Sequence, residues 1–245
     1  IVNEVENALP ACGTLVKQTP PCWIGDTDRD ARDLVPCKNL ILNARTRETF
    51  PLTPKFFCPW GLPFAYNPHA PQPQNWLRFL HDDLWSNDSD AVDTLQEFMG
   101  LSLSANTRFQ KILLVPGPKR GGKGTIAGVW SAMLGSVNVA APTLAGLATN
   151  FGLQSLVGKP LAIISDARLS GRPDQAVVVE RLLSISGEDA ITIDRKHRDP
   201  ITVTLPTRIA IMTNELPRLN DASGAPPSRF IVLRPTQSFY GKEDH

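Results

Sequence analysis

The segment that most constrains the fold of this 245-residue chain is a glycine-rich run between two apolar stretches. The apolar run Ile112–Val115 leads directly into GPKRGGKGT, which extends from Gly117 to Thr125. Apolar side chains then recur at helical spacing, at Ile126, Val129, Trp130, Met133 and Leu134. A buried strand, a tight loop and an amphipathic helix in this order are typical of a phosphate-binding loop.

The residue types of the loop match the pattern G-x-x-x-x-G-K followed by Gly-Thr. Glycines allow a tight turn in which backbone N–H groups converge on phosphate oxygens, and Lys123 can reach the β- and γ-phosphates. Gly124 holds the usual Ser or Thr position, so the hydroxyl for Mg²⁺ comes one residue later, from Thr125. The predicted ATP site comprises Gly117, Pro118, Lys119, Arg120, Gly121, Gly122, Lys123, Gly124 and Thr125.

Three further apolar runs follow the loop, at Leu161–Ile164, Ile209–Met212 and Phe230–Leu233. Helical segments are expected between the runs, at about 123–134 and 175–185. Short apolar runs bounded by turn residues favour strands that are buried on both faces of a parallel sheet. We therefore predict an α/β fold of the P-loop NTPase type, AAA+-like, with a central and mainly parallel sheet.

Polar residues come directly after two of these runs. Asp166 follows Ser165 after one run, and Asn214 follows Thr213 after another. Asp166 can bind Mg²⁺ or polarise the attacking water, so either this carboxylate serves both roles or a second acid comes from elsewhere. Asn214 is expected to orient the water as a sensor of the γ-phosphate.

Proline divides the region before the loop into two parts. Eleven of the 22 prolines fall between Pro10 and Pro73, which predicts an irregular, linker-like segment over residues 1–74. The proline-free window that follows predicts two helices, which form a small accessory region over residues 75–105. The cysteines lack the close pairs of a zinc site, so we expect buried, reduced thiols at Cys12, Cys22, Cys37 and Cys58.

The chain is nearly neutral, with 25 Lys+Arg against 24 Asp+Glu, so a nucleic-acid partner must be held by a local basic patch. Alternating Ile and Thr residues over 190–205 predict a β-hairpin. Its loop, from Asp194 to Pro200, carries the candidate DNA-binding residues Arg195, Lys196, His197 and Arg198. Basic residues on a protruding hairpin favour contact with a phosphate backbone, whereas a merely solvated tip is the alternative that composition alone favours.

The composition also excludes some classes of protein. No run approaches the roughly 18 consecutive apolar residues of a membrane-spanning helix, and the balance of hydrophobic and charged residues is not that of a disordered chain. The chain begins at Ile1 without a signal peptide, so we interpret it as part of a longer polypeptide.

In this order, the segments GPKRGGKGT, LAIISDARLSGR, LLSISGEDAITIDRKHRD, IAIMTNELPRL and SRFIVLRPTQSFYGKED resemble the superfamily 3 helicases. The nearest branch is that of the phage and plasmid primase-helicases, which are related to the poxvirus primase-helicase. The resemblance implies an ATPase core over residues 106–245, truncated at its C-terminus. It also implies a linker to an upstream primase domain, resembled by DLVPCKNLILNARTRETFPLTP, and a cytoplasmic protein of a bacterial host, encoded by a phage, prophage or plasmid.

The resemblance assigns roles to single residues of the ATP site. It implies that Lys123 and Thr125 bind nucleotide and Mg²⁺, and that Asp166 is the Walker B acid and a second Mg²⁺ ligand. It implies that Asn214 is the sensor. Because the family usually has an acidic pair or a glutamate at Walker B, the pair Ser165-Asp166 leaves the identity of the catalytic base open.

The resemblance also assigns residues outside the ATP site. It implies that Lys196 contacts single-stranded DNA in the central channel of a homo-oligomeric ring, a hexamer in the full-length protein. Arg229 resembles the arginine finger that reaches the neighbouring subunit's nucleotide, with Arg218 as the rival candidate. The implied function is an ATP-dependent DNA helicase motor that translocates on single-stranded DNA.

Two alternative functions stay open. The lone acid at position 166 keeps open a nucleotide-gated DNA-binding or initiator module with weak hydrolysis. A P-loop nucleotide kinase is the other alternative, because G-x-x-x-x-G-K-G-T is also the loop of adenylate kinases. Such kinases place the loop near the N-terminus and need an arginine-bearing lid, whereas here 116 residues precede Gly117.

Overall fold

A computed structural model describes residues 19–26, 28–86, 88–165, 175–215 and 226–241. Its centre is a five-stranded sheet in the order β12-β6-β11-β8-β7, in which all neighbouring strands are parallel. These strands are β6 (Ile112–Pro116), β7 (Val139–Ala140), β8 (Leu161–Ser165), β11 (Arg208–Thr213) and β12 (Phe230–Val232). The predicted α/β fold is confirmed. Only β7 was not expected, because two residues are too few to make a recognisable apolar run.

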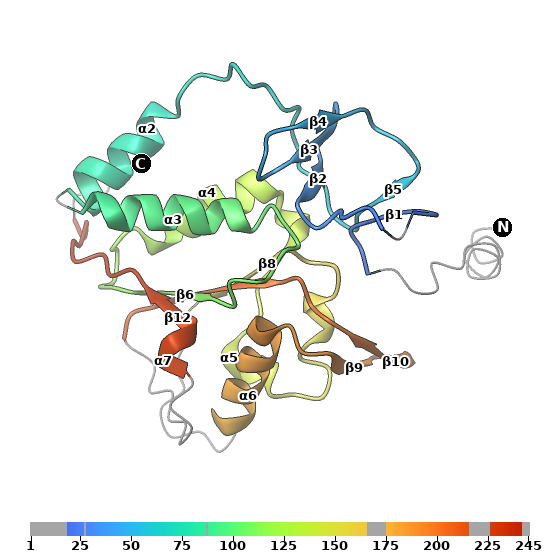
Figure 1. Ribbon diagram of the computed structural model, residues 1–245. Coiled ribbons are helices and arrows are strands. Elements are labelled where there is room, and N and C mark those ends of the chain that lie inside the picture. The colour runs from blue at the N-terminus through green and yellow to red at the C-terminus, as the bar shows by residue number, and fades with distance from the viewer. Residues whose placement is uncertain (1–18, 27, 87, 166–174, 216–225, 242–245) are drawn as a thin grey trace.

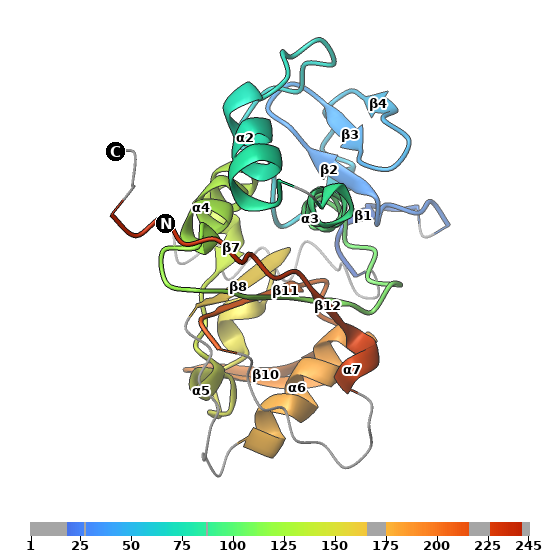
Figure 2. The same ribbon diagram turned by 90° about the vertical axis from the view of Figure 1, so that its left-hand side faces the viewer.

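Helices cover both faces of this sheet, as Figure 1 shows. One face carries α2 (Gln74–Arg78), its π-helical continuation η1 (Phe79–Leu84), α3 (Ser89–Leu101) and α4 (Lys123–Leu134). The other carries α5 (Leu144–Leu147), α6 (Gln175–Gly187) and α7 (Pro226–Arg229). Short 3-10 helices, η2 (Ser136–Asn138) and η3 (Gln154–Leu156), lie in the connections. The turned view in Figure 2 shows the sheet between the two helical layers.

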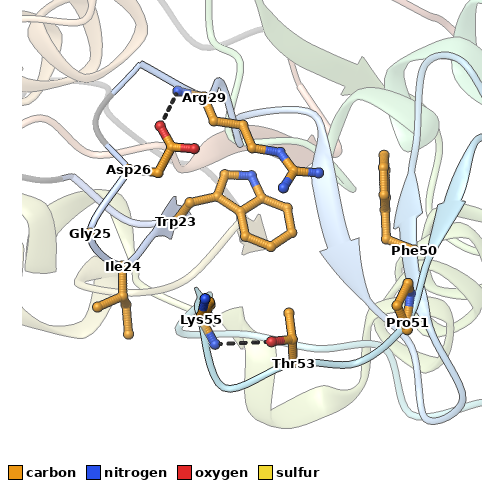
Figure 3. A pocket seen from close by; sticks show the side chains of 9 residues that line it. All are labelled: Trp23, Ile24, Gly25, Asp26, Arg29, Phe50, Pro51, Thr53 and Lys55. Atoms are coloured by element: carbon orange, nitrogen blue, oxygen red, sulfur yellow. Dashed lines mark hydrogen bonds between the residues drawn. The ribbon is translucent and has the colours of Figure 1, made fainter.

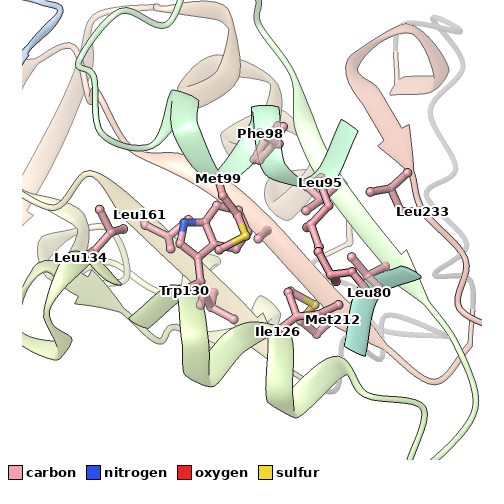
Figure 4. Close-up of a cluster of buried hydrophobic side chains, with 14 of the residues drawn as sticks. Leu80, Leu95, Phe98, Met99, Ile126, Trp130, Leu134, Leu161, Met212 and Leu233 are labelled. Atoms are coloured by element: carbon pink, nitrogen blue, oxygen red, sulfur yellow. The ribbon is translucent and has the colours of Figure 1, made fainter. Parts of the chain in front are cut away.

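The main core lies between the sheet and the helices α3 and α4 (Figure 4). Trp130 of α4 is fully buried, and its ring meets the ring of Phe98 of α3 edge to face at a centroid distance of 5.9 Å. The Trp130 Nε1 donates a hydrogen bond of 2.8 Å to the Oγ of Ser102, just after α3. The helical accessory region is therefore packed directly on the helix that follows the glycine-rich loop.

Residues 19–73 are more regular than the linker-like segment that their prolines predict. Strand β1 (Cys22–Trp23) pairs with β5 (Phe56–Phe57), and a three-stranded antiparallel sheet is formed by β2 (Leu34–Pro36), β3 (Ile41–Asn43) and β4 (Thr49–Phe50). The strands have two or three residues each, so they fit between the prolines, which lie at strand ends and in connections. Trp23, Ala31, Leu34 and Ile41 give this N-terminal β unit a small core of its own.

The thiols of this β unit are free at Cys22, Cys37 and Cys58. Cys22 and Cys37 are buried, and burial raises the pKa of the half-buried Cys58 to about 12. Cys12 lies outside the described residues. Among the described helices, none has the length and apolar character needed to cross a membrane.

Candidate nucleotide-binding site and basic hairpin

The glycine-rich loop lies at the carboxyl edge of the parallel sheet, between the end of β6 and the start of α4. The N–H of Gly117 donates to the carbonyl oxygen of Thr213 at 3.0 Å, which ties the loop to the end of the neighbouring strand β11. Asn214 follows Thr213 and is half-buried. The structure therefore brings Asn214 to the edge of the sheet where the loop begins, as the strand order predicts.

The backbone of the loop is suited to binding an anion. Arg120 and Gly122 have φ angles of 58° and 76°, in the left-handed region that a tight turn uses. Gly122 is the N-cap of α4 and has no side chain to accept the first N–H groups of the helix. These donors and the positive end of the helix dipole suit a phosphate, and the exposed Thr125 in the first turn offers an oxygen ligand for Mg²⁺. The residues present therefore fit ATP and Mg²⁺.

The side chain of Lys123 folds back over the loop. Its Nζ donates to the carbonyl oxygens of Gly117 at 2.7 Å and of Pro118 at 2.6 Å. A charged phosphate oxygen is a stronger acceptor for an ammonium group than a neutral carbonyl oxygen. Lys123 is therefore placed so that a phosphate in the loop can replace these carbonyl contacts.

Two segments distant in sequence pack against the loop, and the sequence did not predict either contact. A Cβ added at Gly122 would lie 2.9 Å from the ring of Phe79 and 3.0 Å from Leu84, both in η1. Beyond β12, the N–H of Phe239 donates to the carbonyl oxygen of Arg120 at 3.0 Å, and the Oγ of Ser238 donates to that of Lys119 at 3.0 Å. The loop is thus held from the accessory region and from the C-terminal segment.

We expect Gly122→Ala to lower the free energy of unfolding by about 1–3 kcal/mol. Alanine would have to adopt the left-handed backbone conformation of this position, and its Cβ would collide with Phe79 and Leu84. Gly124→Ala is the matched control. Its Cβ would meet nothing within 4 Å, and alanine favours a helix over glycine by about 1 kcal/mol. Denaturant unfolding measures both variants; equal stabilities of the two would contradict the packing of η1 on the loop.

Arg229 lies far from the loop. It precedes β12, and the pairing of Phe230 with Ile112 places it level with Lys111, at the amino edge of the sheet. Its guanidinium packs on Gly187 at the end of α6, and its Nη1 is buried with no hydrogen-bond partner in the described parts of the chain. Two more residues predicted for this site lie outside the described residues. They are Asp166, the expected Walker B acid, and Arg218, the alternative candidate for the arginine finger.

The predicted hairpin is formed by β9 (Ile191–Arg195) and β10 (Arg198–Val203). Ile193 pairs with Ile201 and Thr192 with Thr202, so isoleucines share one face and threonines the other, as predicted. The tip is shorter than the predicted loop of residues 194–200. The strands continue to Arg195 and Arg198, because a positive φ of 60° at His197 allows the chain to reverse over two residues.

The basic tip is held by one hydrogen bond from a neighbouring element and by one within the hairpin. The N–H of Lys196 donates to the Oε1 of Gln154 in η3 at 2.9 Å, and the Nε of Arg195 donates to the carbonyl oxygen of Asp199 at 2.9 Å. Lys196, His197 and Arg198 are exposed. The side chains predicted to bind DNA are therefore presented together on a supported projection. Gln154 was not predicted, since nothing in its local sequence shows that η3 packs on the hairpin.

Comparisons with known proteins agree with this architecture. Residues 3–85 match the family described as D5 N terminal like, and residues 115–229 match a family of unknown function, DUF5906. Two apo structures of the NrS-1 C-terminal region share the fold, with TM-scores of 0.59 and 0.60 at 14% and 13% identity. They align over 96% and 94% of this chain. These structural matches show that this chain shares its fold with the NrS-1 C-terminal region.

The chain spans about half of the solved NrS-1 structures, 52% and 53% of their lengths. A structure of JCV helicase also matches, with a TM-score of 0.44 and 17% identity over 61% of this chain and 41% of that one. The likeness to the NrS-1 structures is one of fold, an α/β fold around a central parallel sheet.

Proposed function

We propose that this chain is the ATPase motor of a replication primase-helicase, which hydrolyses ATP to move on single-stranded DNA. The observation that carries the proposal is the uncapped N-terminus of α4 behind a left-handed Gly122, with Lys123 turned over the loop. Backbone donors, a helix dipole and one ammonium group then converge on a single position. This is the arrangement that binds and polarises a triphosphate.

Mg²⁺ would be held by Thr125 and Asp166, and the metal would neutralise charge that develops on the transferred phosphoryl group. Asn214, beside the loop at the end of β11, would orient the attacking water through its amide. Lys123 would exchange the carbonyls of Gly117 and Pro118 for phosphate oxygens. In this account each group stabilises charge or positions a reactant, which is how phosphoryl transfer is mainly catalysed.

Arg229 would act on the nucleotide of a neighbouring subunit. It lies level with Lys111 at the amino edge of the sheet, whereas the loop begins at Gly117 at the carboxyl edge. Six residues of strand at roughly 3.3 Å each separate the two ends by about 20 Å, which is beyond the reach of an arginine side chain. A finger at this position therefore requires a head-to-tail contact between copies, and such contacts close into rings. We infer a homo-oligomer, hexameric in a full-length protein with an upstream primase domain.

The hairpin tip would contact the phosphate backbone of the DNA. Lys196→Ala is expected to lower the affinity for a single-stranded oligonucleotide about tenfold and to remove the stimulation of ATP turnover by DNA, because it deletes the exposed ammonium group at the tip. Fluorescence anisotropy and a coupled ATPase assay measure the two effects. Lys38→Ala, which removes an exposed lysine from the β2–β3 connection, should behave as wild type. Stimulation that survives Lys196→Ala would show that the hairpin does not couple DNA to hydrolysis.

A further inference from the structure

A second candidate site lies in the N-terminal β unit, at a distance in sequence from both the loop and the hairpin. It is a cavity of about 460 Å³ between β1 and the segment that follows β4 (Figure 3). Its lining combines aromatic rings, two cationic side chains and a hydroxyl. The lining residues are Trp23, Ile24, Gly25, Asp26, Arg29, Phe50, Pro51, Thr53 and Lys55.

The walls of the cavity are flat and aromatic. The guanidinium carbon of Arg29 lies 3.7 Å from the centre of the Trp23 ring and 5.4 Å from that of the Phe50 ring. Trp23 and Phe50 are 6.4 Å apart with their planes at 79°. In Figure 3, Trp23 and Arg29 lie on one side of the cavity and Phe50 on the other. Trp23 is only 5% exposed and belongs to the small core of the N-terminal β unit, and Phe50 packs against that core. Packing therefore fixes the positions of both rings.

The polar groups of the cavity are mainly donors that lack acceptors. The Nε1 of Trp23 is buried and has no hydrogen-bond partner within the described ranges. The guanidinium of Arg29 lies over the Trp23 ring, and a guanidinium in this position can still donate hydrogen bonds from its N–H groups. Neither Arg29 nor Lys55 forms an ion pair with another described residue. The Oδ1 of Asp26 already accepts from the backbone N–H groups of Asp28 and Arg29, both at 3.3 Å.

A ligand that complements this lining needs a flat apolar part and an anionic, acceptor-rich part. A nucleoside phosphate has both, because its base can stack on an aromatic ring while its phosphate binds cations. The cavity has the size of a single nucleotide rather than of a protein surface. Figure 1 shows the β1–β5 ribbon and the β9–β10 hairpin on the same, right-hand side of the molecule, which is the side where a bound strand would meet the hairpin.

We propose that this cavity binds one nucleotide unit of single-stranded DNA, with the base against Phe50 and the phosphate at Arg29 and Lys55. The proposal rests on the proposed function only in taking DNA as the source of the nucleotide. The cavity then forms a second contact for the strand, outside the motor core. All of its lining residues belong to the N-terminal β unit and none to the hairpin, so it would be a contact separate from the hairpin.

The test is the affinity of the chain for fluorescein-labelled (dT)15, measured by anisotropy. Arg29→Ala should weaken binding about tenfold, whereas Lys38→Ala, which removes the same charge from an exposed site in the same β unit, should change it less than twofold. Phe50→Leu should weaken the binding of (dT)15 but not that of an abasic deoxyribose-phosphate 15-mer. The double variant Arg29→Ala/Lys196→Ala should show the product of the two single losses, because distant sites act independently.

The outcomes separate this proposal from the proposed function. If Lys196→Ala weakens binding while Arg29→Ala equals Lys38→Ala, the cavity proposal is wrong and the motor proposal stands. If wild type fails to bind (dT)15, both are wrong. Arg29-dependent binding of poly-glutamate without Arg29-dependent binding of (dT)15 would overturn the proposal in favour of an acidic protein partner. Titration with thymidine 5′-monophosphate tests the source of the nucleotide. If this free nucleotide binds as tightly as (dT)15, the nucleoside-phosphate chemistry is confirmed, but the ligand is a free nucleotide and not DNA.

Discussion

Lys123→Ala is expected to reduce ATP turnover at least a hundredfold. The side chain that it removes is the ammonium group turned over the loop, with its Nζ 2.7 Å and 2.6 Å from the carbonyl oxygens of Gly117 and Pro118. Loss of one preorganised donor to a developing charge costs roughly 10²- to 10³-fold in rate. The fold should survive, because Lys123 is only half-buried at the first position of α4 and alanine is a good helix former.

The matched control for this variant is Lys119→Ala. Lys119 belongs to the same loop and carries the same charge, but its side chain is exposed, and its contact with Ser238 is made by the backbone carbonyl. ATP turnover of Lys119→Ala should stay within a few fold of wild type. A steady-state ATPase assay with unfolding curves for all three proteins measures both points. Equal losses in the two variants would mean that the loop needs positive charge in general and not the placement of Lys123.

Trp130→Ala is expected to lower the free energy of unfolding by about 3–5 kcal/mol. The indole is fully buried between α3 and the sheet, it meets Phe98 edge to face, and it donates to the Oγ of Ser102. Removal of the ring leaves a cavity between the accessory region and the domain of the parallel sheet, among the buried side chains of Figure 4. Equilibrium unfolding in guanidinium chloride, followed by circular dichroism, measures the loss.

Two further variants show how much of that loss of stability is specific to the buried ring and to its hydrogen bond. Val129→Ala removes a neighbouring apolar side chain of α4 that is 36% exposed, and it should cost less than about 1 kcal/mol. Trp130→Phe keeps most of the ring but deletes the donor to Ser102, and we expect a cost of about 1–2 kcal/mol. If Trp130→Ala unfolds at the same denaturant concentration as Val129→Ala, α3 is not packed on α4 in solution.

The central sheet could be predicted because most of its strands are marked by a short apolar run in the sequence. Ile112–Val115 and Ile209–Met212 are continuous apolar runs, and a strand buried on both faces requires such a run. The position of Asn214 beside the loop followed from the same argument, since parallel strands end at one edge of the sheet. The two faces of the hairpin could also be predicted from the sequence. Successive side chains of a strand point to opposite faces, so Ile193 and Thr192 lie on different faces.

The contacts that complete the site could not be predicted in this way, because they join segments far apart in the chain. Phe79 meets Gly122, Phe239 meets Arg120, and Gln154 meets Lys196, and no local pattern specifies these partners. In the N-terminal β unit, proline content predicted an irregular segment. The structure instead uses strands of two or three residues that fit between the prolines, and the aromatic side chains Trp23 and Phe50 supply the packing there.

The rate of ATP hydrolysis with and without single-stranded DNA tests the central claim most directly. We predict Mg²⁺-dependent turnover by the wild-type chain that rises several-fold on addition of (dT)15 and vanishes in Lys123→Ala. A nucleotide kinase would instead transfer phosphate to added nucleoside monophosphates, and an initiator module with weak hydrolysis would turn over ATP at the same low rate with or without DNA. Turnover that does not respond to DNA would contradict the motor account.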